Sequence, residues 1–362
     1  MEKKQMIVEA GSKLFEAIRN RDEAAWCEAL AVEGAAQERD AMGRSVIHRV
    51  ALSRDAPAKW MRQAFDRGAL LEQLDLEGWT ALQIACKRGR ADAVEALVDL
   101  GADTSAVVKI SKGYPRVRYA PAQIAAAYGR MEAYEALAKK LSGKLPCNGE
   151  AGRPIFLAAV FGCHEMVKSM VESGVAMKKA KIKGMREEPS LLSVAVMKKH
   201  KKVFDALMEL GAPIEEAEKG RGGVRAMHVA AASPDASYLK ALLKKGAQID
   251  PQTSTGWTPL HVACEKDKAA NVEMLLAAGA DPRKKTERGR TAAQVAAHHN
   301  SIEALEALIK RDPDLATEPD GEGKRALDLL NEQSRPRAES LVLFSVTTAP
   351  APGGPSKASR RI

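Results

Sequence analysis

The chain has 362 residues, of which 45% are hydrophobic and only 4% aromatic, and its formal net charge at pH 7 is +9. No stretch approaches the ~20 apolar residues that a membrane span needs, and the N-terminus lacks the apolar core of a secretory signal. The five cysteines are odd in number, share no metal-ligand spacing and fit a reducing compartment. We therefore expect a soluble cytoplasmic protein.

A short motif that ends in a small residue recurs along the chain at intervals of 33 to 40 residues. A fixed period of this length is typical of units that cannot bury a core alone and must stack into a solenoid. The residues that close the motif are Val50, Ala85, Ala125, Ala158, Ala195, Ala230, Ala263, Ala296 and Leu330.

Most of these motifs continue into a second apolar stretch that ends in Gly and a small residue. Residues 91–98 end this way at Gly101, and residues 272–276 at Gly279. Apolar residues three and four apart mark one buried helical face, and Gly supplies the left-handed C-terminal cap. Each unit is thus predicted as a helix, a tight turn, an antiparallel helix and a loop.

The motif itself carries a family resemblance. Residues 256–263 read Gly-x-Thr-Pro-Leu-His-x-Ala, and residues 78–85 give a weaker form. This pattern resembles the ankyrin repeat over roughly residues 13–335. The resemblance implies an all-α solenoid of about ten helix-turn-helix units, with capping units at both ends and β-hairpin finger loops. We expect residues 1–12 to be an N-terminal lead and residues 336–362 to be a mostly disordered tail.

Two intervals are longer than the rest, and both place their extra length where the ankyrin family has its finger. Residues 104–118 and 176–186 alternate apolar and basic residues around a Gly turn, which is a hairpin signal. Neither segment contains an acidic residue. Two adjoining long fingers would form a basic claw for an acidic partner; the alternative is that lysine-rich hairpin tips are merely solvated.

The four tryptophans divide into two pairs. Trp79 and Trp257 each follow the motif Gly on a finger, where a large ring is either an anchor for a partner or packing over the neighbouring finger. Trp26 and Trp60 fall on apolar helical faces and are expected in the core.

The histidines do not indicate catalysis. Three of them occupy the motif's His slot, which the ankyrin family uses for hydrogen bonds between adjacent repeats, and glutamine replaces them elsewhere. The slot residues are His48, Gln83, Gln123, His228, His261 and Gln294. The pair His298-His299 lacks a third ligand for a metal. We expect no enzymatic activity, no cofactor and no metal.

The apolar run at residues 341–346 lies inside the expected tail. Left bare, such a run favours aggregation. It is predicted to cover the last repeat; the alternatives are a docking peptide for another protein and a strand that meets a second copy.

The expected function is that of a monomeric protein-interaction scaffold. It would bind another protein with an acidic surface through its concave face and the two basic fingers. The alternatives are binding of nucleic acid or anionic membrane by the same fingers, and a secreted bacterial effector that binds a host protein. The candidate partner-binding residues are Lys109, Lys112, Tyr114, Arg116, Arg118, Lys178, Lys179, Lys181, Lys183, Arg186, Trp79 and Trp257.

Overall fold

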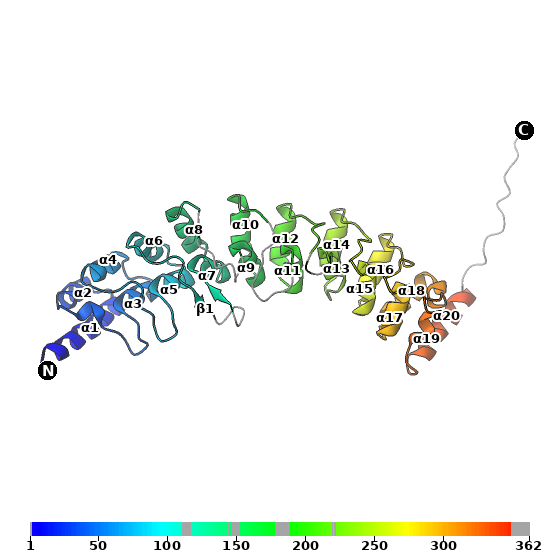
Figure 1. Ribbon diagram of the computed structural model, residues 1–362, viewed down its shortest axis with the longest axis horizontal. Helices are drawn as coiled ribbons and strands as arrows, with labels where there is room; N and C mark the ends of the chain where they lie inside the picture. The colour runs from blue at the N-terminus through cyan, green and yellow to red at the C-terminus, as the bar shows by residue number, and fades with distance from the viewer. Residues whose placement is uncertain are drawn as a thin grey trace, which may run out of the picture. The chain divides into compact units, whose positions relative to one another are not determined.

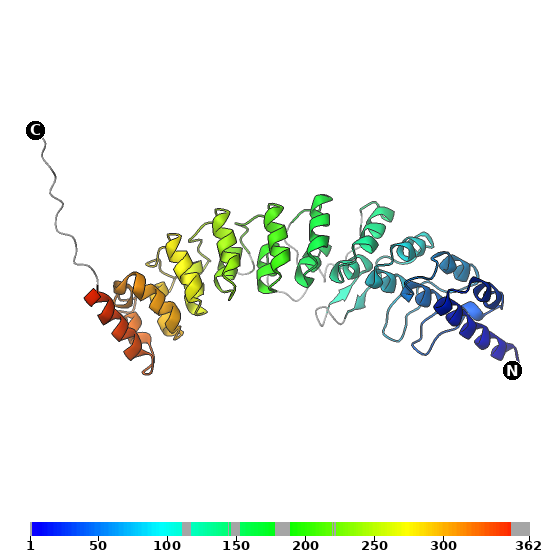
Figure 2. The same cartoon turned by 180° about the vertical axis from the view of Figure 1, so that it is seen from behind.

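The computed structural model describes residues 2–110, 117–143, 145, 153–177, 189–218, 220 and 222–348. The chain divides between Ala212 and Pro213 into two compact units. Each unit is built from helix pairs, and its helices form two rows (Figures 1 and 2).

In the first unit, the first helix of each pair packs against the first helix of the next pair. This inner row consists of α1 (Glu2–Asn20), α3 (Val46–Leu52), α5 (Ala81–Arg88), α7 (Pro121–Ala127), α9 (Pro154–Phe161) and α11 (Leu191–Met197). The outer row consists of α2 (Glu23–Leu30), α4 (Lys59–Asp66), α6 (Ala91–Asp99), α8 (Met131–Lys140), α10 (His164–Glu172) and α12 (Lys201–Glu209). A 3-10 helix, η1 (Ala35–Gln37), follows α2 and packs against α1.

The second unit repeats this arrangement. Its inner row consists of α13 (Ala226–Ala231), α15 (Pro259–Glu265), α17 (Ala292–His298) and α19 (Ala326–Leu329). Its outer row consists of α14 (Ser237–Lys244), α16 (Ala269–Ala277), α18 (Ile302–Arg311) and α20 (Arg335–Thr348), with a 3-10 helix, η3 (Pro313–Ala316), after α18. These helix pairs confirm the all-α repeat fold predicted from the period.

The motif residues explain where an inner helix begins. Before α15, the Thr258 hydroxyl accepts a hydrogen bond from the His261 N–H (3.4 Å), and Nδ1 of His261 accepts one from the Thr258 N–H (3.2 Å). This reciprocal capping satisfies two of the backbone donors that a helix start leaves open. Pro259 occupies the first helical turn, where its missing N–H costs nothing.

The same slot residue also connects neighbouring repeats. Because Nδ1 of His261 accepts from the backbone, its Nε2 carries the proton and donates to the Arg290 carbonyl oxygen at 3.2 Å. Equivalent bonds join His48 to Trp79 (3.0 Å), Gln83 to Ala106 (2.9 Å), His228 to Trp257 (3.1 Å) and Gln294 to Glu318 (2.9 Å). The structural role predicted for the slot is therefore confirmed at these positions.

Small side chains at the motif ends allow the inner helices to approach closely. Ala85, Ala125 and Ala263 are among the fully buried residues of the inner row. The predicted core tryptophans are also buried, and the rings of Trp26 and Trp60 stack with centroids 4.6 Å apart.

The N-terminal end differs from the expected lead, because α1 is helical from Glu2. Its buried stripe includes Ala10, Gly11 and Leu14. A Cβ built on Gly11 would lie 2.5 Å from Cβ of Glu38, so the helix passes very close to the chain after η1. The apolar periodicity read from Leu14 onward in fact begins about one turn earlier, at small residues that give a weak signal.

The C-terminal end also differs from the expected tail. Helix α20 begins at Arg335 and packs against α18, and Ala338 is buried there. The apolar run at 341–346 is part of α20; Leu341 and Val342 are half-buried, whereas Leu343 is 68% exposed. Which of the three alternatives applies to the run therefore stays a prediction. Residues 349–362 lie outside the described part of the chain.

Candidate partner-binding surfaces

The first long finger is a hairpin at its described base. Strand β1 (Val108–Lys109) pairs antiparallel with β2 (Arg118–Tyr119), so that Val108 faces Tyr119 and Lys109 faces Arg118. Val108 and Tyr119 are buried, whereas Lys109 and Arg118 are exposed. The predicted alternation of apolar and basic residues thus holds here, and the two cations share the exposed face of the hairpin. Figure 1 shows where β1 lies, next to α7.

The remaining predicted finger residues lie outside the described residues. These are Lys112, Tyr114 and Arg116 of the first long finger, and Lys178, Lys179, Lys181, Lys183 and Arg186 of the second. Only Lys109 and Arg118 of the predicted basic claw therefore have a structural description.

Trp79 and Trp257 occupy the same motif position but have different surroundings. The Trp79 ring is 5% exposed, and Nζ of Lys87 lies 4.3 Å from its centroid, a cation–π distance. A binding anchor needs accessible ring surface, which Trp79 does not have. For Trp79 the structure favours packing, the second of the two interpretations that the sequence leaves open.

Trp257 is only partly buried and lines a pocket of about 490 Å³ in the second unit. The pocket lies between two successive fingers and the end of α17. The pocket is also lined by one acidic residue, Glu287, and by four residues with basic side chains: Arg288, Arg290, His298 and His299. His298 and His299 are exposed at the end of α17, and both line this pocket together with Trp257.

Sequence reasoning also missed a group of aliphatic side chains on one finger of the first unit, the loop between α4 and α5. Leu70, Leu74 and Leu76 are all more than half exposed, and Leu76 reaches 75%. The Leu76 N–H donates to the Met42 carbonyl oxygen of the preceding finger at 3.0 Å. Large apolar side chains exposed together on one loop mark a protein contact surface more often than singly scattered ones do. The signal in the sequence was four leucines within a predicted loop.

The slot histidines are not poised for acid–base chemistry. Burial lowers the pKa of His48 and His228, and it lowers the pKa of His261 to about 4. In His261 both ring nitrogens are also engaged with backbone groups. Within the described residues, no group of three or more His, Cys, Asp and Glu side chains is placed to hold a metal ion.

Comparison with known families agrees with this architecture. A family model described as ankyrin repeats (three copies) matches residues 14–108 and again residues 192–286, which together make up more than half of the chain. The chain belongs to the ankyrin-repeat family. Ankyrin repeats are generally protein-interaction modules without enzymatic activity. No curated protein matches the sequence.

The interval between the two matched ranges contains most of the first long finger and all of the second. The first match ends at residue 108, within β1, and the second begins at residue 192, after the second long finger. The insertions break the ankyrin period at these points. In the described part of the chain, none of the helices combines the length and apolar character of a membrane span.

Proposed function

We propose that this ankyrin protein is a non-enzymatic scaffold that binds an acidic protein through its fingers and concave face. The observation that carries this proposal is the cross-strand pair of Lys109 and Arg118 on the outward face of the first long hairpin. Two cations side by side on an exposed face produce a positive potential that attracts the carboxylates of an acidic partner.

The hairpin holds the two cations in place before a partner arrives. Val108 and Tyr119 are buried at its base. The preceding finger is hydrogen-bonded to the chain just before the hairpin, because the Glu72 carboxylate accepts from the Asp103 N–H at 2.8 Å. Side chains presented on a fixed backbone lose little conformational freedom on binding, which favours affinity. Their positive charge would also speed encounter with an acidic partner.

The exposed leucines suggest that the partner is not purely polar. Leu74 and Leu76 lie on the finger before the basic hairpin. Apolar contacts at the centre of an interface supply much of the binding free energy, and surrounding charges supply orientation. A partner segment with carboxylates next to aliphatic or aromatic residues fits this surface. In the second unit, Trp257 with Arg288 and Arg290 offers a similar combination.

We also propose that the protein acts as a monomer in a reducing compartment such as the cytoplasm. The support for a reducing compartment is that Cys86 and Cys264 are free thiols buried in equivalent inner helices. Burial raises the pKa of both thiols, which keeps them unreactive.

The test is a comparative pulldown with the full chain. Lys109→Gln with Arg118→Gln should lose the partners that wild type recovers. Lys139→Gln with Lys202→Gln removes the same charge from exposed positions on α8 and α12 and should recover them. Equal recovery by all three proteins would show that the finger is not the site.

A second measurement separates protein from nucleic-acid binding. Wild type is titrated with duplex DNA at about 50 mM salt, where phosphate contacts are strong. Absence of binding supports a protein partner. Binding that weakens steeply with salt and requires Lys109 and Arg118 would overturn it.

A further inference from the structure

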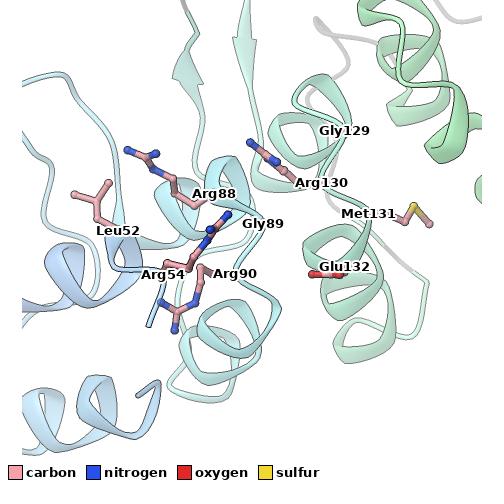
Figure 3. A pocket seen from close by; sticks show the side chains of 9 residues that line it. All are labelled: Leu52, Arg54, Arg88, Gly89, Arg90, Gly129, Arg130, Met131 and Glu132. Atoms are coloured by element: carbon pink, nitrogen blue, oxygen red, sulfur yellow. The ribbon is translucent and has the colours of Figure 1, made fainter. Parts of the chain in front are cut away.

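We propose that the first unit contains a second, separate binding site, which takes a small ligand carrying two or more phosphate groups. The site is a pocket of about 650 Å³ at the edge where the helix pairs turn, away from the finger residues described above. It is lined by three successive turns, at residues 52–54, 88–90 and 129–132. Figure 3 shows the side chains of Arg54, Arg90 and Arg130 around Gly89.

Arg90 is part of the pocket wall and not a free cation. Its guanidinium donates to the carbonyl oxygens of Val50 (3.3 Å) and Ala56 (2.8 Å), and to both carboxylate oxygens of Asp92 (2.8 and 2.7 Å). These four bonds engage all three nitrogens of the guanidinium group, and the Asp92 carboxylate offsets its charge. Arg90 therefore fixes the turn on which the other arginines depend.

Arg130 is held by its Nε alone. That atom donates to the Lys87 carbonyl oxygen at 3.1 Å. The aliphatic part of the side chain crosses Gly89, where an added Cβ would lie 3.0 Å from Cδ of Arg130. Within the described residues, the two Nη atoms of Arg130 have no protein acceptor. The side chain is thus placed while most of its donors stay available.

Arg54 and Arg88 are exposed, and neither forms an ion pair within the described residues. Three guanidinium groups without a carboxylate partner therefore face this pocket, and its acidic lining residue is Glu132. Like charges at this density repel each other. A multivalent anion would relieve that repulsion, and its oxygens would satisfy the open donors.

The type of cation in the pocket restricts which class of anion fits it. Every cation that lines the pocket is an arginine. The planar guanidinium group matches the geometry of phosphate oxygens bidentately, which the lysine ammonium group cannot do. The chemistry therefore points to phosphate more than to a diffuse acidic surface.

The size and lining of the pocket further restrict the range of phosphate ligands that fit. Its volume falls in the range of about 300–1,000 Å³ that is usual for small-molecule sites, which exceeds the needs of one phosphate. No aromatic side chain lines it, and the apolar lining is limited to residues such as Leu52 and Met131. A nucleobase would have nothing to stack on. Recognition therefore rests on the phosphates and not on a base.

The test is isothermal titration of the full chain with tripolyphosphate at about 0.15 M salt. We expect one site with a Kd of about 100 μM or tighter. Arg54→Gln with Arg88→Gln should weaken binding about tenfold or more. Glu132→Gln should strengthen binding about threefold, because it removes the opposing charge. A gain of affinity cannot result from misfolding.

Two control variants make the result specific. Lys139→Gln with Lys202→Gln, and Lys109→Gln with Arg118→Gln, each remove two charges elsewhere in the first unit and should leave the Kd unchanged. Equal weakening by these controls, or no binding of tripolyphosphate at about 1 mM, would overturn the site. The finger variant also separates this proposal from the proposed function, because each can fail while the other holds.

Vesicles that contain a bisphosphorylated phosphoinositide distinguish a lipid headgroup from a free ligand. Competition between these vesicles and tripolyphosphate supports the shared phosphate chemistry. ATP should bind no more tightly than tripolyphosphate, since the pocket has no surface for adenine. A clear preference for ATP would contradict the proposed lining.

Discussion

Nη2 of Arg90 donates a 2.8 Å hydrogen bond to the carbonyl oxygen of Ala56, a residue of the preceding helix pair. Similar bonds recur at the turns of other pairs: Arg130 to Lys87 (3.1 Å), His200 to Val160 (2.9 Å), Asn271 to Ser233 (2.8 Å) and Ser301 to Glu265 (3.3 Å). Each unit therefore has hydrogen bonds between repeats at the turn edge, in addition to those of the His and Gln slot near the fingers.

Replacing Arg90 should destabilise the first unit. The Arg90→Met side chain keeps the aliphatic packing but leaves the Val50 and Ala56 carbonyl oxygens without these donors. Loss of donors to buried acceptors costs about 1–3 kcal/mol for each group, so we expect about 2–4 kcal/mol in total. The measurement is urea denaturation, with hydrogen exchange in α3 to α6 to locate the effect. Asp92→Asn, a partly exposed partner, should cost less than about 1 kcal/mol. Equal costs for the two variants would contradict this account.

Acid should weaken the second unit through His261. Its pKa is about 4 in the folded protein, below the usual value of 6.5. Between these values the unfolded chain binds the proton and the folded chain does not, so stability falls as the pH falls. The loss should be about 2 kcal/mol at pH 5 and approach about 3 kcal/mol below pH 4.

The matched variant for this prediction is His261→Gln. Glutamine fills the same slot at Gln83 and Gln294, where it makes the equivalent bond. The variant should therefore fold and lose the part of the pH dependence between about pH 4 and 6.5 that His261 contributes, while the part from His228 remains. Urea denaturation at pH 7, 6 and 5 measures it. An unchanged pH dependence would show that other groups cause the acid sensitivity.

Gly11→Ala should destabilise the N-terminal end although alanine is the better helix former. The added Cβ would lie 2.5 Å from Cβ of Glu38, which is close to the backbone and cannot swing away. Overpacking of this kind costs about 1–3 kcal/mol, more than the ~1 kcal/mol that alanine gains in a helix. Ser12→Ala, on the exposed side of the same turn, should be neutral or slightly stabilising. Thermal unfolding of both variants tests the difference.

The two finger tryptophans should respond differently to replacement by alanine. Trp79→Ala should cost about 3–5 kcal/mol in unfolding free energy, because the ring is buried. Trp257→Ala should cost markedly less, since its ring is partly exposed, and should lower partner recovery instead. Urea denaturation and pulldown of each variant decide this. A large loss of stability in Trp257→Ala would assign that ring to packing as well.

The repeat architecture could be predicted from the sequence because it depends on local signals. The motif at residues 256–263 contains the helix start, the slot histidine and the buried alanine in one contiguous stretch. The hairpin base followed from alternating side chains, and the structure confirms it at Val108 and Tyr119. Such features depend on neighbours in the sequence.

The turn-edge features could not be predicted in the same way. Arg90, Arg130, His200 and Ser301 make similar contacts although the residue at this position can be arginine, histidine or serine, so the sequence shows no common motif. The arginine pocket combines residues from three repeats that only stacking brings together. A usable signal did exist, since Arg88 is the last residue of the inner helix α5, and Arg54 and Arg130 come two and three residues after the inner helices α3 and α7 of the neighbouring repeats.

The mixture of histidine and glutamine in the slot makes some interfaces between repeats sensitive to acid and leaves others insensitive. The bonds of His48, His228 and His261 are made by rings whose pKa burial lowers, whereas those of Gln83 and Gln294 do not titrate. In the second unit, the histidine bonds connect the repeats of α13 and α15 to the repeats that come after them. The glutamine bond connects the repeat of α17 to the last repeat. In mild acid, unfolding of this unit should therefore begin at its N-terminal helix pairs, and the last helix pairs should unfold last.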